Sequence, residues 1–105
     1  MTPAPALAAA DPDFDLLPAL GHAVTALDAF LARATRAVRL KVERNGRVAS
    51  DLVDAEQRAA HGLAWVATYV EALRELAAYA ERLSDAGRFG DLERAIVEVG
   101  FAEYI

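Results

Sequence analysis

The chain offers few side chains that could perform chemistry. His22 and His61 are its only histidines, and they fall in different predicted helices. A di-iron bundle would need Glu-x-x-His on its helices, but Arg58 stands three residues before His61. A zinc site would need more ligands than two separated histidines without a single cysteine. Ser50 and Ser84 fall at predicted helix ends, where capping accounts for them. We therefore predict no catalytic, cofactor-binding or metal-ligating residue here, and interpret His61 as a surface or inter-domain contact.

The segment Gly87-Arg88-Phe89-Gly90 resembles a phosphate-binding loop only in its two glycines. It matches neither the Walker pattern nor GxGxxG. We interpret it as a turn between two helices, with Phe89 packed back onto the bundle.

A basic segment is the strongest charge feature. Six of the eleven basic residues fall within fifteen positions and are opposed by one acid, Glu43. Cations near a helix C-terminus complement its dipole, and acids of another helix could pair with them. The alternative is a site for an anionic partner, either a phosphate-bearing cofactor or an acidic protein surface. The net charge of −5 argues against nucleic acid. The basic segment consists of Arg33, Arg36, Arg39, Lys41, Arg44 and Arg47.

Aromatic residues form the other candidate site. Trp and Tyr combine an apolar body with a polar tip, so they occur both in cores and at protein interfaces. Both interpretations stay open from the sequence. The candidate interface residues are Trp65, Tyr69, Tyr79 and Tyr104.

Three helices must position these residues. Apolar side chains recur at alternating spacings of three and four, which predicts helices over 13–44, 51–85 and 91–105 and no strand. Asn45-Gly46 and Gly87 are predicted stop signals, because these residues tolerate the left-handed conformation that ends a helix. Residues 1–12 are rich in Pro and Ala and are predicted to be a disordered or loosely attached lead-in.

The short connections predict an all-α antiparallel bundle of three helices over residues 13–105. The second helix has apolar residues over about half its circumference and the third is apolar nearly all round, which is more than a lone bundle needs. We therefore expect self-association, or the rest of a larger protein, to complete it. Ile105 lacks a C-cap, so a longer polypeptide or a bound partner is expected there. The residues predicted to be buried are Leu27, Leu31, Leu63, Val66, Val70, Leu73 and Ile96.

No apolar run approaches the roughly 18 residues that a membrane span needs. The N-terminus has no basic region before its alanines, unlike a secretory signal. The absence of cysteine suits a reducing compartment. We expect a cytoplasmic protein that binds neither membrane nor nucleic acid.

Two stretches carry a family resemblance. DAEQRAAHGLAWVATYVEALRELAAYAERL at 54–83 and GRFGDLERAIVEVGFAEYI at 87–105 resemble the N-terminal helical extension of acyl-CoA dehydrogenases of the (2S)-methylsuccinyl-CoA dehydrogenase type. The similarity covers about half of the chain, and the first helix matches only in general character. It implies a larger homo-oligomeric flavoprotein that binds FAD and oxidises a short branched acyl-CoA with a glutamate base. None of that family's flavin or base motifs falls within this chain, so no catalytic residue is carried over.

Two functions remain open from the sequence. The first is an accessory domain of an FAD-dependent acyl-CoA dehydrogenase, which acts in packing, in assembly or in shaping the substrate entrance. The second is a stand-alone, self-associating helical module without catalysis. The reading frame beyond Ile105 distinguishes them.

Overall fold

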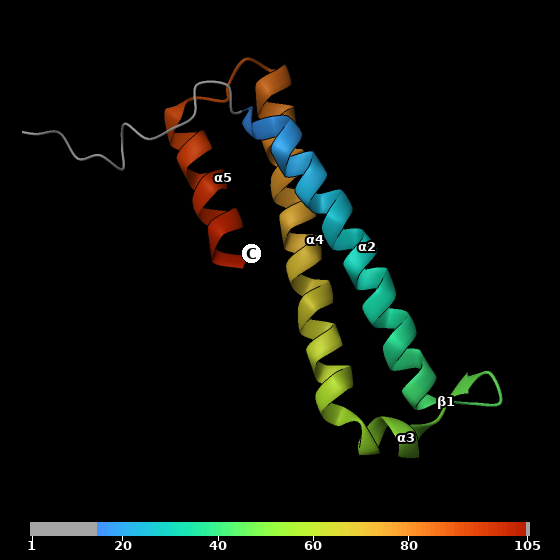
Figure 1. Ribbon diagram of the computed structural model, residues 1–105. Coiled ribbons are helices and arrows are strands. Elements are labelled where there is room, and N and C mark those ends of the chain that lie inside the picture. Colours follow the sequence, from blue (N-terminus) through green and yellow to red (C-terminus); the bar gives the residue numbers. More distant parts are fainter. Residues whose placement is uncertain (1–14, 105) are drawn as a thin grey trace, which may run out of the picture.

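The computed structural model describes residues 15–104, so the predicted lead-in over 1–12 lies outside the described residues. Two long antiparallel helices, α2 (Leu16–Val42) and α4 (Gln57–Asp85), form the frame. Helix α5 (Asp91–Tyr104) runs antiparallel to α4 and lies beside the C-terminal half of α4 (Figure 1). The predicted all-α antiparallel bundle is confirmed.

Helix α2 begins where the sequence places a cap. Asp15 has the extended conformation of an N-cap residue, although its side chain makes no capping hydrogen bond. Pro18 is the third helical residue, where a missing backbone N–H costs no intrahelical bond. The helix ends at Val42, with the backbone N–H of Glu43 bonded to the carbonyl oxygen of Arg39.

The connection after α2 is a small hairpin, so the prediction of no strand is wrong. Strands β1 (Glu43–Arg44) and β2 (Arg47–Val48) pair antiparallel, with Arg44 opposite Arg47. Asn45 and Gly46 both have positive φ, 55° and 77°. Positive φ at both central residues is the pattern of a two-residue hairpin turn, for which Asn-Gly is the preferred sequence. The same dipeptide also stops helices, and the prediction used only that property.

The predicted second helix is divided. Helix α3 (Ser50–Ala55) is followed by Glu56, whose φ of −112° and ψ of 33° break the helical geometry before α4 begins. The backbone N–H of Glu56 still finds acceptors in the carbonyl oxygens of Leu52 and Val53. Because α3 packs against both long helices, the break turns the chain from the hairpin into α4 (Figure 1).

The turn between α4 and α5 follows well-known capping rules. Gly87 has a positive φ of 68°. The backbone N–H of Gly87 donates to the carbonyl oxygen of Ser84, and the backbone N–H of Arg88 donates to the carbonyl oxygen of Leu83. These two bonds are the Schellman motif. The carboxylate of Glu93 then accepts from the N–H of Gly90 at 3.1 Å, which is half of a capping box. The prediction of a helix-to-helix turn is confirmed.

The hydrophobic core lies at one end, where α2, α4 and α5 meet. Phe89 packs against this core, as predicted. Helix α5 has 14 residues and α4 has 29, so α5 is about 21 Å long beside a helix of about 43 Å. Away from α5, the two long helices pack against each other and against α3. The core residues are Leu16, Leu20, Leu73, Ala80, Val97 and Phe101.

The predicted burial is confirmed in part. Val70 and Leu73 are buried, whereas Ile96 is 50% exposed, so its predicted burial is wrong. Val97 and Phe101 face the core in its place. Because α5 is apolar on most sides, its sequence did not determine which side would face inward. The remaining predicted residues are half-buried: Leu27, Leu31, Leu63 and Val66.

Gly100 and Gly62 provide a matched test of the α4–α5 contact. A Cβ at Gly100 would lie 2.4 Å from Cδ2 of Leu76, while one at Gly62 would meet nothing within 4 Å. Alanine gains about 1 kcal/mol over glycine inside a helix. We expect Gly62→Ala to stabilise by up to that amount, Gly100→Ala to stabilise less because Leu76 must move, and Gly100→Val to destabilise. Urea unfolding measures the free energy of unfolding of each variant. An equal increase for Gly62→Ala and Gly100→Ala would contradict the close contact between Gly100 and Leu76.

Candidate functional site

Four rings on α4 and α5 form a continuous row. His61, Trp65 and Tyr69 follow at steps of four residues, which places them on one side of α4. The ring centroids of His61 and Trp65 are 6.0 Å apart, those of Trp65 and Tyr69 are 5.6 Å apart, and Tyr104 of α5 stacks at 5.0 Å from Tyr69. We call His61, Trp65, Tyr69 and Tyr104 the aromatic row.

The aromatic row is only partly covered by the described residues. The side chain of Trp65 is 50% exposed, and those of Tyr69 and Tyr104 are exposed as well. The indole Nε1–H of Trp65 donates to Nε2 of His61 at 2.6 Å, so its polar tip is already satisfied. The row therefore presents ring faces and edges, together with the polar tips of its two exposed tyrosines.

The structure brings together three of the four candidate interface residues and adds a fourth ring. Tyr79 is exposed, but it makes no ring contact with the aromatic row within the described residues. From the sequence, His61 was interpreted as a surface or inter-domain contact, separately from the aromatic residues. Its position four residues before Trp65 is the signal that could have identified it, because side chains at that spacing meet on a helix. The interface role of these residues stays a prediction.

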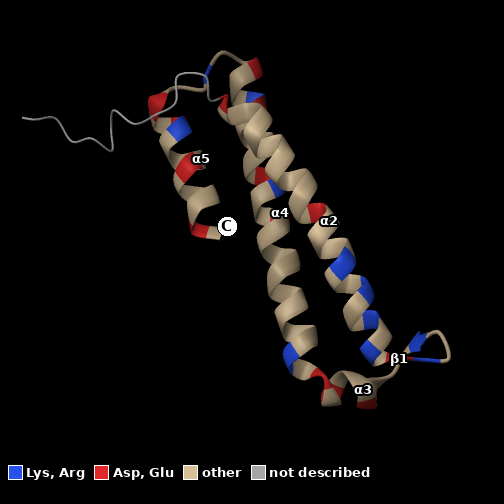
Figure 2. Ribbon diagram, in the orientation of Figure 1, with Lys and Arg blue, Asp and Glu red and all other residues tan. Residues whose placement is uncertain are grey.

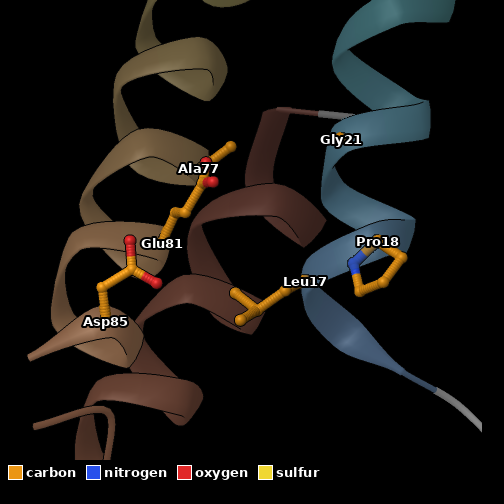
Figure 3. A pocket seen from close by; sticks show the side chains of 6 residues that line it. All are labelled: Leu17, Pro18, Gly21, Ala77, Glu81 and Asp85. Atoms are coloured by element: carbon orange, nitrogen blue, oxygen red, sulfur yellow. The ribbon is translucent and has the colours of Figure 1, made fainter. Parts of the chain in front are cut away.

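Two hollows lie on the surface of the described residues. One, of about 300 Å³, follows the side of α4 formed by His61, Ala64, Trp65 and Thr68. The other, of about 420 Å³, lies between the beginning of α2 and the end of α4 (Figure 3). Its lining contains two carboxylates but neither a histidine nor a lysine to work with them. The lining residues are Leu17, Pro18, Gly21, Ala77, Glu81 and Asp85.

The basic segment runs along the C-terminal half of α2 and into the hairpin (Figure 2). Nε of Arg39 donates to Glu43 at 2.7 Å, one helical turn away. Arg44 holds both carboxylate oxygens of Asp51, at 2.8 and 3.2 Å. These hydrogen bonds lower the pKa of the Asp51 carboxyl below its ordinary value.

The other four members of the basic segment are exposed and form no ion pair within residues 15–104. Local pairing therefore accounts for two of the six cations, and the anionic-partner alternative stays a prediction for the others. They are Arg33, Arg36, Lys41 and Arg47.

One ion pair joins the two long helices. Arg74 of α4 donates through both terminal nitrogens to the carboxylate of Asp28 of α2, with Nη1 at 2.7 Å from Oδ2. Its Nε donates to Glu71 at 3.0 Å. These bonds raise the pKa of Arg74 and lower that of Asp28. The sequence alone does not indicate the pair, because its partners are 46 positions apart and lie on different helices.

Residues 15–104 contain no group of three His, Cys, Asp or Glu side chains that could hold a metal ion. Among the same residues, no helix is long and apolar enough to cross a membrane.

No model of a known protein family matches the chain. Over 91 residues the chain is 42% identical to the (2S)-methylsuccinyl-CoA dehydrogenase of Cereibacter sphaeroides. The resemblance seen in the sequence is confirmed. The match covers 87% of this chain but 17% of the dehydrogenase. It therefore extends well beyond the half of the chain in which the resemblance was first seen, and most of the dehydrogenase has no counterpart here.

The Asp28–Arg74 pair predicts a pH-dependent contribution to stability. The pKa of Asp28 is lower in the folded protein, so the contribution is present above the ordinary aspartate pKa of about 3.9 and is lost as the pH falls through the folded-state value. We expect Asp28→Asn to lower the free energy of unfolding at pH 7 and to lose its effect at low pH. Both side chains are partly exposed, so salt should reduce the effect.

Chemical denaturation at pH 7 and pH 3 measures this difference. Asp54→Asn is the control, because Asp54 is exposed and forms no ion pair in the described part of the chain. If Asp28→Asn and Asp54→Asn had the same free energy of unfolding at both pH values, the Asp28–Arg74 pair would contribute nothing to stability.

Proposed function

We propose that this chain is an accessory helical domain of an FAD-dependent acyl-CoA dehydrogenase, which acts in packing, in assembly or in shaping the substrate entrance. The observation that carries the proposal is the 42% identity to one segment, 17% of the length, of a dehydrogenase. The substrate of the full protein would be a short branched acyl-CoA such as methylsuccinyl-CoA, and its location would be the cytoplasm.

The chemistry of the described residues supports an accessory role. Neither hollow is lined by a Lys or Arg that could hold the pyrophosphate of FAD. The exposed cations of the basic segment lie on α2 and the hairpin instead (Figure 2). Binding of FAD and the oxidation itself would belong to other parts of the full protein.

A second candidate function is the stand-alone, self-associating module. The exposed apolar side chains of α4 and α5 favour it. Sequencing the gene beyond the codon of Ile105 separates the two candidates. A reading frame that continues into a dehydrogenase supports the accessory domain, and a stop codon at that point supports the module.

We expect the purified 105-residue chain to be colourless after incubation with FAD and to contain no stoichiometric metal. The reason is the lack of a flavin cradle and of a ligand cluster among the described residues. A visible absorbance spectrum after gel filtration and elemental analysis measure both. A yellow protein, or one zinc per chain, would contradict the accessory role.

Deletion of this segment from the full-length dehydrogenase tests the role directly. We expect the flavin content to be unchanged, because the flavin would be held elsewhere. The melting temperature or the subunit number should fall, because an apolar surface would lose its cover. Loss of FAD together with activity would instead place this segment in the cofactor site. Visible absorbance, calorimetry and light scattering on the two proteins distinguish these outcomes.

A further inference from the structure

The large exposed hydrophobic side chains are concentrated on two helices. Ten such residues occur among the described residues, and seven of them belong to α4 and α5, whereas α2 and the hairpin carry Phe30, Leu40 and Val48. We call the seven the α4–α5 face. They are Trp65, Tyr69, Tyr79, Leu92, Ile96, Val99 and Tyr104.

On α4, the helical period places the aromatic members of this face on one side. Successive residues are separated by about 100°, so Trp65, Tyr69 and Tyr79 lie roughly 40–120° to one side of the buried Leu73. Arg74, which reaches across to α2, lies roughly 100° to the opposite side. The aromatic side of α4 therefore points away from α2.

Helix α5 presents its apolar stripe on the same side. Its rotation is fixed by Val97 in the core and by the contact of Tyr104 with Tyr69. Leu92, Ile96 and Val99 then lie roughly 100–160° to one side of Val97. Because α5 is antiparallel to α4, these rotations turn both stripes to the same side of the helix pair. The α4–α5 face is thus one surface across two neighbouring helices.

The area of this face suits a protein interface. The exposed fractions of its seven side chains, from 36% to 69%, correspond to an apolar area on the order of 600 Å², if a full aromatic side chain offers about 150–250 Å². Contiguous exposed apolar patches of more than a few hundred Å² are uncommon on monomers. A specific interface buries about 800 Å² on each partner. The face with its polar rim is therefore large enough for a stable dimer.

We propose that the α4–α5 face docks against the same face of a second copy of this chain, forming a two-fold dimer. This proposal concerns the 105-residue chain itself and is tested on that chain, separately from the accessory role. The contact is apolar, and each copy carries a net charge of −5. Salt should therefore strengthen the dimer by screening the repulsion between the copies.

The chain supplies its own probe, because Trp65 is its only tryptophan and belongs to the α4–α5 face. Sedimentation equilibrium over a hundredfold range of concentration should show a monomer–dimer equilibrium. Trp65 emission should shift to shorter wavelength over the same range as water leaves the ring. Added salt should lower the dissociation constant. Association that weakens with salt would overturn the proposal and point to the basic segment as the contact.

A pair of matched variants tests the location. Leu92→Glu changes an exposed residue in the first turn of α5, where an acid suits the helix dipole and folding should be undisturbed. Leu40→Glu makes the same change at a residue of α2 that is 83% exposed and lies outside the face. We expect Leu92→Glu to raise the dissociation constant at least tenfold and Leu40→Glu to leave it unchanged, apart from the small effect of one charge.

Circular dichroism confirms that both variants keep their helices before they are compared. Equal weakening by the two variants, or an unaffected dimer in Leu92→Glu, would overturn the location. A wild-type chain that stays monomeric at every concentration and salt level would overturn the dimer. The α4–α5 face would then be left for another part of a longer subunit, while the accessory role would be judged separately by the deletion experiment.

Discussion

The contact of α5 with α4 is the interaction on which the rest of the structure depends. Leu73 and Val97 are the largest fully buried side chains, and they come from these two helices. The turn that brings them together is fixed by backbone bonds to Gly87 and Arg88 and by the carboxylate of Glu93. Among residues 15–104, α2, α4 and α5 share a core at one end of the molecule. The aromatic row continues from this core along α4, and Tyr104 of α5 contacts Tyr69 in it.

The opposite end is held in a different way. There α2 and α4 pack against each other and against the short helix α3, with Val42 buried. Arg44 and Asp51 fix the hairpin to the start of α3, while the Asp28–Arg74 pair ties the two long helices together next to the core residue Leu73. The ion pairs at this end join residues that are close in the sequence and hold the hairpin in place. The unpaired cations of the basic segment lie on the same end of the molecule (Figure 2), outside the apolar α4–α5 face.

The described residues thus carry surfaces of different chemistry: an apolar face on α4 and α5, and cations on α2 and the hairpin. In a segment that matches 17% of a dehydrogenase, such surfaces support the contacts that we propose, between parts of a protein or between subunits. Apolar contact supplies most of the free energy of such association, and charge mainly affects its specificity and rate. The accessory role and the dimer therefore draw on the same physical property, although either can fail without the other.

The sequence by itself determined the helical class, the stop at Gly87, the inward packing of Phe89 and the burial of Val70 and Leu73, because these follow from local capping and from a clear helical period. It did not determine the hairpin, since Asn45 and Gly46 satisfy both a helix stop and a two-residue turn. Nor did it predict the break at Glu56, where no Gly or Pro marks the boundary. Which side of α5 faces inward, Val97 or Ile96, was decided by packing, because both sides are apolar and only the contact with α4 distinguishes them. The same holds for the aromatic row: residues four apart, such as Trp65 and Tyr69, share a side of a helix, but the contact of Tyr104 with Tyr69 joins two helices and depends on how α5 packs against α4.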